Sequence, residues 1–272
     1  MFAMQLAGID FTSRPTRRKP ITVALGALDR GVVKLLRVDT HESFEGFLAW
    51  LRTPGPWLAA CDFPFGLPRE LVLGLGWPTE WLPLMRHYAA LSREEIRDTF
   101  AAFCDARPAG AKFAHRACDG PAGSSPSMKW VNPPVAYMLH AGVPLLLEAG
   151  VHLPGLHTGD PSRVALEAYP GLLARELIAR RSYKSDDKAR QTPERLIARK
   201  DIVDALEQGR TRLGLRLRLS HAQRDALVAD ASGDSLDAVL CLVQAAWASG
   251  QPGHGLPADA DTLEGWIVSA VP

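Results

Sequence analysis

The segment LAGIDFTSRPTRRKPITVALGALDRGVVKLLRV, residues 6–38, holds three runs that are rich in apolar and β-branched residues, at 6–11, 21–28 and 32–38. A polar, proline-containing stretch separates the first run from the second. Only Asp29-Arg-Gly separates the second from the third, which is short enough for a β-hairpin. We therefore predict that the chain starts with an antiparallel meander of three strands.

A helix and a fourth strand are predicted next. Thr40 is a good N-cap residue, and apolar residues share one helical face at Phe44, Phe47, Leu48 and Leu51. Pro54-Gly-Pro ends this helix. Residues 57–63 are apolar except for Asp62 near their end, and such a run is typical of a strand that is buried on both faces of a sheet.

The pattern then changes to helices that are separated by loops rich in Gly, Pro and Ser. We interpret residues 67–161 as a helical insertion after the fourth strand. A fifth strand is predicted at 163–168, and the remainder reads as helical, with the last strong helix at about 235–249. The insertion thus separates the fourth strand from the fifth.

Two helix starts are well marked in the second half of the chain. Thr192-Pro-Glu places a proline at the first helical position, and Ser220-His-Ala-Gln has the spacing of a capping box. The order of strands and helices predicts the α/β class, with a mixed five-stranded sheet covered by helices on both faces. The length suits one such domain with an insertion, so we expect a single domain over residues 1–272.

Charge is nearly balanced over the whole chain. Lys and Arg number 31 against 30 Asp and Glu, so the net charge of +1 neither predicts nor excludes a polyanionic partner. Between Arg175 and Arg218, however, thirteen basic residues face seven acidic ones, an excess of six positive charges. Two solvated helices and a phosphate-facing surface are both consistent with this excess.

The cysteines and the apolar runs indicate a cytoplasmic protein. Four cysteines lie far apart and form no Cys-x-x-Cys pair, so we expect reduced, buried thiols at Cys61, Cys104, Cys118 and Cys241. The N-terminus has no secretion signal, and the longest apolar runs fall short of the roughly 20 residues that span a bilayer. We therefore expect no membrane partner.

Four acidic residues lie at the ends of predicted strands or at a helix start: Asp10, Asp62, Glu167 and Asp237. Carboxylates that are brought together in a fold repel one another unless a cation lies between them. Hard divalent ions such as Mg²⁺ or Mn²⁺ prefer oxygen ligands. Because these acids fall on one sheet, they predict a site for such ions.

Three of these acids also have an ordinary structural explanation. Asp10 suits a turn at the end of a strand, and Asp62 suits a structural salt bridge. With Asp234 as N-cap, Asp237 falls in the first turn of a helix, where an acid is favoured by the helix dipole.

Four short segments carry a family resemblance: Ala7-Gly-Ile-Asp-Phe, Cys61-Asp-Phe-Pro-Phe-Gly, Glu167-Ala-Tyr-Pro and Asp234-Ser-Leu-Asp-Ala. They resemble, in order and over almost the whole chain, the motifs of domain-of-unknown-function family 429, whose members are predicted to be ribonuclease H-like nucleases. The resemblance implies a ribonuclease H-like sheet with the first acid on the first strand and the second at the end of the fourth. It also implies metal-ligand roles for Asp10, Asp62, Glu167 and Asp237. The long insertion departs from the best-studied members of the superfamily, so no particular substrate is implied.

The resulting hypothesis is a metal-dependent nuclease that hydrolyses nucleic acid, DNA or RNA, with two Mg²⁺ or Mn²⁺ ions. Asp10 would bridge the two ions, Asp62 and Glu167 would each complete one, and Asp237 would ligate an ion or orient the water. Basic residues between Arg175 and Arg218 would hold the backbone of the nucleic acid.

Four basic residues are candidate substrate contacts: Arg116, Lys129, Lys184 and Lys188. Arg116 and Lys129 lie in the insertion, beside Trp130, which would offer a stacking surface or a core anchor. Lys184 and Lys188 lie between two predicted helices, where they would contact a phosphate or simply face water.

Two other functions stay open. Sugar kinases and actin-like ATPases share this kind of sheet, but they would also need a duplicated sheet and glycine-rich phosphate loops, which the sequence does not display. The other alternative is a non-catalytic module that binds nucleic acid or protein, in which the acids only cap helices and form ion pairs.

Overall fold

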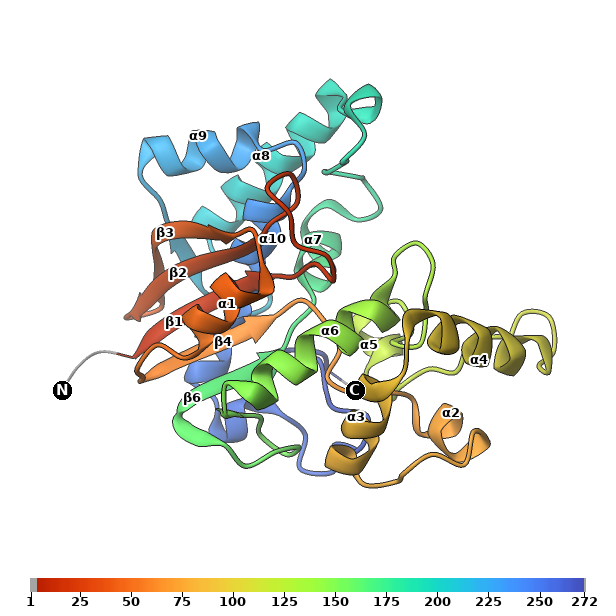
Figure 1. Ribbon diagram of the computed structural model, residues 1–272. Helices are drawn as coiled ribbons and strands as arrows, with labels where there is room; N and C mark the ends of the chain where they lie inside the picture. Colours follow the sequence, from red (N-terminus) through yellow and green to blue (C-terminus); the bar gives the residue numbers. More distant parts are fainter. Residues whose placement is uncertain (1–3, 272) are drawn as a thin grey trace.

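The computed structural model describes residues 4–271, and its centre is a mixed sheet of seven strands (Figure 1). The strand order is β5-β6-β4-β1-β2-β3-β7. The strands are β1 (Gln5–Asp10), β2 (Ile21–Asp29), β3 (Val32–His41), β4 (Trp57–Cys61), β5 (Val151–His152), β6 (Asp160–Glu167) and β7 (Arg216–Arg218). Strand β2 is antiparallel to both of its neighbours, whereas every other neighbouring pair is parallel.

The predicted α/β class and mixed sheet are confirmed, but the predicted number of strands is too low. The five expected strands correspond to β1, β2, β3, β4 and β6. Strands β5 and β7 were not expected and lie at the two edges of the sheet. They have only two and three residues, which is too short for a periodic pattern to show in the sequence.

Ten α-helices are described: α1 (Phe44–Leu51), α2 (Arg69–Gly74), α3 (Trp81–Ala90), α4 (Arg93–Asp105), α5 (Asp119–Ala122), α6 (Val135–Glu148), α7 (Pro170–Ile178), α8 (Pro193–Glu207), α9 (His221–Ala229) and α10 (Asp234–Ser249). Two short 3-10 turns are η1 (Lys188–Arg190) and η2 (Pro252–Gly255). The helix starts predicted at Thr192 and Ser220 are confirmed, and the second has a complete capping box. The prediction of Thr40 as an N-cap is wrong, because β3 continues through it and Ser43 caps α1.

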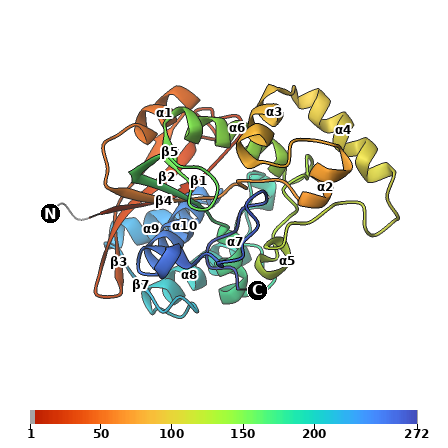
Figure 2. The same cartoon turned by 90° about the horizontal axis from the view of Figure 1, so that it is seen from below.

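Helices cover both faces of the sheet (Figures 1 and 2). Helices α1, α3 and α6 share one buried cluster with the side chains of Ala7 and Ile9 from β1. Helices α7, α8 and α10 form the other cluster with Leu6 and with residues of β3 and β4. The sequence region 67–161 comprises α2 to α6 and β5. Most of its buried apolar side chains belong to the cluster of Ala7 and Ile9, whereas Cys118 and Ala122 belong to a third, smaller cluster.

Helix α10 lies directly against β1, because Gly8 has no side chain. A Cβ at this position would overlap the backbone of Ala238 and Leu242 in α10. A glycine inside a strand is typical of such a close backbone approach. The contact matters for the site described next, since Asp10 and Asp237 lie on these two elements.

Candidate metal centre

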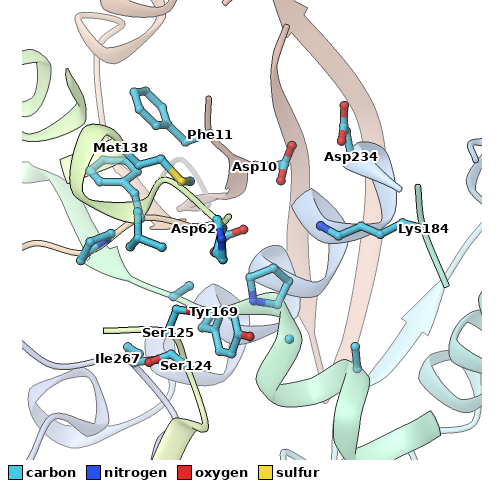
Figure 3. A pocket seen from close by; sticks show the side chains of 18 of the residues that line it. Asp10, Phe11, Asp62, Ser124, Ser125, Met138, Tyr169, Lys184, Asp234 and Ile267 are labelled. Carbon is cyan, nitrogen blue, oxygen red and sulfur yellow. The ribbon is translucent and has the colours of Figure 1, made fainter. Parts of the chain in front are cut away.

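Asp10 and Asp62 lie side by side at the carboxyl ends of two parallel strands. Ile9 in β1 is in register with Cys61 in β4, so the next residue of each strand is one of these acids. Asp237 comes from the first turn of α10. One carboxylate oxygen from each of the three acids lies within 4.8 Å of the other two. Figure 3 shows Asp10 and Asp62 together in the wall of a cavity. We call these three residues the carboxylate cluster.

The surroundings of Asp10 and Asp62 compensate the charge of these two carboxylates only in part. Asp10 is only 7% exposed, and Asp62 is partly buried. Among the described residues, no hydrogen-bond donor contacts either carboxylate. Burial raises the pKa of Asp10 well above its usual value, and the neighbouring charge of Asp237 adds to this. Burial also raises the pKa of Asp62 to about 7, although Lys184 acts in the opposite direction. The two carboxylates therefore lack a partner for their negative charge.

Asp237 is held differently from the other two acids. Its side chain is fully buried, and it accepts hydrogen bonds from the hydroxyl of Tyr183 and from Nζ of Lys184. The expected role as a helix-capping acid belongs to another residue. Gly233, rather than Asp234, is the N-cap of α10, and Asp230 accepts hydrogen bonds from the amides of Gly233 and Ser235.

Lys184 brings a positive charge to the cluster from the segment between α7 and α8. Burial alone would lower the pKa of Lys184, but the charges of Asp237, Asp10 and Asp62 raise it well above its usual value. The segment is anchored by Arg199, whose guanidinium donates to the carbonyl of Tyr183 at 2.7 Å. Ser185 also donates its amide to the carbonyl of Ala231 at 3.0 Å. These contacts fix the ammonium group beside Asp237.

A second layer of charge surrounds the cluster. Lys19, in the connection between β1 and β2, forms ion pairs with Asp234 at 2.6 Å and with Asp186 at 2.9 Å. Burial raises the pKa of Asp234. These pairs neutralise Asp234 and Asp186, so Asp10 and Asp62 remain the acids of this region without a cation or a donor of their own among the described residues.

Glu167 does not join the carboxylate cluster, although it ends β6 as predicted. Its two oxygens accept from the guanidinium of Arg116 at 2.7 and 2.8 Å, and one of them also accepts from the amide of Phe65 at 2.9 Å. Arg116 is buried and pairs with Asp119 as well. A buried charge is stable only when it is paired. Glu167 therefore lies outside the carboxylate cluster and is paired, and the guanidinium of Arg116 is bound by two carboxylates, although both residues line the cavity.

Of the three other basic residues that were predicted to contact substrate, only one lies at the cavity. Lys184 lines the cavity, but Lys129 and Lys188 do not. Lys129 is partly buried at the turn before α6, and Lys188 is exposed in η1. Trp130 packs against Phe113, with ring centroids 5.7 Å apart, which agrees with the core-anchor alternative. Of the basic residues between Arg175 and Arg218, three line the cavity: Arg175, Arg181 and Lys184.

The four cysteines are free and buried, as expected.

The cavity beside the cluster has a volume of about 610 Å³. Its walls come from the end of β1, the segment after β4, the start of α7 and the insertion. Several of its residues were not among the predicted site residues, including Lys19, Tyr169 and Tyr183. The sequence alone gave little reason to select these residues. They lie outside the strand ends at which the four acids were found, and no motif marks them as ligands.

Comparisons with family models, with curated proteins and with solved structures found no match. Among residues 4–271, no helix combines the length and the apolar character that a membrane crossing requires. The function is therefore inferred below from the side chains of the carboxylate cluster and of the cavity.

Proposed function

We propose that this protein is a metal-dependent phosphodiesterase that hydrolyses nucleic acid. The observation that supports this most directly is Asp10, a buried carboxylate without a hydrogen-bond donor that lies beside Asp62 and Asp237. A set of carboxylate oxygens at such distances suits a hard divalent ion, Mg²⁺ or Mn²⁺.

The sheet supports a ribonuclease H-like fold for this function. The five longer strands follow the order β3-β2-β1-β4-β6, and β2 is the antiparallel member. Asp10 ends the first strand and Asp62 follows the fourth, which are the positions that the family resemblance implies for the first two acids. Strands β5 and β7 would then be additions at the edges.

The residues fit one ion better than two. Asp10 and Asp62 would ligate it directly, and Asp237 would complete the site on the side opposite the cavity. Glu167 is paired with Arg116, so the second ion of the two-ion hypothesis loses one of its expected ligands. The bound ion would supply Lewis acidity toward a phosphate oxygen. Lys184 would hold Asp237 in place and add positive charge where the phosphate enters.

Cleavage assays test this proposal. We expect the purified protein to cleave at least one of a panel of single-stranded and duplex DNA and RNA substrates when Mn²⁺ or Mg²⁺ is present. Asp10→Asn should reduce cleavage to background, because it removes the charge that the ion requires. Asp29→Asn is the matched control, since Asp29 is exposed at the far end of β2. Cleavage that survives Asp10→Asn, or a wild-type protein that neither cleaves nor binds Mn²⁺, would refute the proposal.

Neither alternative function gains support from a specific observation. A phosphotransferase of the sugar-kinase or actin-like class would require a second, duplicated sheet, and the described residues form one sheet. A non-catalytic module would leave Asp10 and Asp62 buried or half-buried without a partner, which is costly when nothing binds there.

A further inference from the structure

The cavity next to the carboxylate cluster has one charged side, one apolar side, and one side on which Ser124 and Ser125 lie beside apolar and aromatic residues. Figure 3 shows Lys184 and Asp234 beyond Asp10 on one side, Phe11 and Met138 on a second, and Tyr169 with Ile267 on a third. Its volume of about 610 Å³ lies in the range of sites that bind one small molecule, about 300–1,000 Å³. The cavity therefore suits a ligand with an anionic end and an apolar, planar part.

Arg175 is the cation of this cavity that has no acidic partner among the described residues. Lys19, Arg116, Arg181 and Lys184 also line the cavity, and each forms an ion pair with a carboxylate. Arg175 instead donates one hydrogen bond to the carbonyl of Ala122 and lies over the ring of Tyr169, 5.3 Å from its centroid. It is exposed and retains several N–H donors. A guanidinium in this state is suited to bind a phosphate.

The carboxylate cluster is recessed, so a phosphate can reach it only by entering the cavity. Asp237 is fully buried, and residues of the insertion at Ser124, Ser125 and Met138 form the wall across from the cluster. The sugar and base that are attached to the phosphate must enter with it. A base that is still paired would bring the second strand against this wall.

We propose that the cavity binds a single unpaired nucleotide, with its phosphate between the carboxylate cluster and Arg175 and its base against the apolar walls. This inference rests on the proposed phosphodiesterase function and names its substrate class, single-stranded nucleic acid. Apolar and aromatic side chains accept any base by stacking, so the site would have little preference for sequence.

Fluorescence anisotropy with a short labelled oligothymidylate, in Ca²⁺ to prevent cleavage, tests the proposal. We expect the wild-type protein to bind the single strand about 100-fold more tightly than the same strand annealed to its complement, as the opening of a base pair implies. Arg175→Met should weaken binding of the single strand about tenfold through the loss of a charged hydrogen bond. Arg180→Met is the matched control, because Arg180 is an exposed neighbour that does not line the cavity.

Further arms separate the possible outcomes. Displacement of the strand by free thymidine monophosphate at similar concentration would identify a site for nucleotides as such. Met138→Trp should reduce binding by filling the cavity, whereas Met138→Leu should not. Equal affinity for duplex, no binding of any strand, or an Arg175→Met protein that binds like wild type would overturn the inference. Mn²⁺ binding, measured separately by electron paramagnetic resonance, tests the metal site, so its absence would instead count against the proposed function.

Discussion

Asp10 and Glu167 are both buried acids at strand ends, but only Glu167 has a hydrogen-bonded and oppositely charged partner. Glu167 receives both charge and hydrogen bonds from Arg116 and the amide of Phe65. Asp10 accepts no hydrogen bond and forms no ion pair among the described residues. Burial raises the pKa of Asp10 well above the usual value, and the charge of Lys184 offsets only part of this effect. A carboxylate in that state is stabilised by a proton or by a cation. The difference between these residues is the physical basis for a metal site at Asp10.

Metal binding should depend on pH through Asp62. Its pKa of about 7 means that below this pH a proton competes with the metal for the carboxylate. We expect Mn²⁺ affinity to fall about tenfold or more for each pH unit below 7, because the raised pKa of Asp10 adds a second competing proton. Titrations monitored by electron paramagnetic resonance between pH 5.5 and about 8.5 measure this. An affinity that stays constant over that range would contradict the assignment of Asp62 as a ligand.

The same shift predicts how the metal-free protein responds to pH. A carboxyl whose folded pKa is raised contributes stability that is present at low pH and is lost as the pH rises through the folded value. We therefore expect the metal-free protein to be about 1 kcal/mol more stable at pH 6 than at pH 8 through Asp62, which is partly open to the cavity. Urea unfolding measures the difference, and Asp62→Asn should reduce it. A metal-free protein whose stability increases from pH 6 to pH 8 would contradict this prediction.

Lys184 should compete with the metal, because its ammonium already lies against Asp237. Removing this charge with Lys184→Met should raise Mn²⁺ affinity about tenfold, since a unit charge near a protein surface is worth on the order of 1 kcal/mol or more. Cleavage at saturating Mn²⁺ should nevertheless decrease, because the phosphate loses a positive neighbour. Lys188→Met is the control, as Lys188 is exposed and lies outside the cavity. Unchanged affinity in Lys184→Met would show that the ammonium does not oppose the ion.

At the scale of elements, the contact between β1 and α10 sets the geometry of the cluster. These elements carry Asp10 and Asp237, and Gly8 allows their backbones to touch. Gly8→Ala should destabilise the fold by about 1–3 kcal/mol or more, since the added Cβ meets backbone rather than a movable side chain. Thermal and urea unfolding measure the loss. Gly120→Ala is the control, because a Cβ there meets no atom within 4 Å.

At the scale of the whole molecule, a metal ion bound at the carboxylate cluster would join parts of the chain that are distant in sequence. A ligand that binds only the folded state stabilises it by about 2.7 kcal/mol at a concentration 100 times its Kd. For a chain of this size we expect saturating Mn²⁺ to raise Tm by roughly 5–10 °C. Differential scanning fluorimetry measures this shift. An equal shift in Asp10→Asn would mean that the ion binds elsewhere.

Local patterns were enough to predict the principal strands, the helix starts at Thr192 and Ser220, and the position of the acids at strand ends. These features depend on residues within a few positions of one another, through backbone geometry, side-chain periodicity and capping. The proximity of Asp10 and Asp62 also followed, because adjacent parallel strands deliver their ends to one edge of the sheet.

Only the tertiary structure shows which charged side chains pair with one another. Arg116 reaches Glu167 from 51 residues away, and Lys184 reaches Asp237 across 53, because the insertion and the segment before α8 fold over the end of the sheet. Sequence patterns report periodicity along one element, but they carry no information on which charges meet across such separations. Three of the four predicted acids therefore share a cluster, while the fourth is neutralised by an arginine that had been expected to contact substrate.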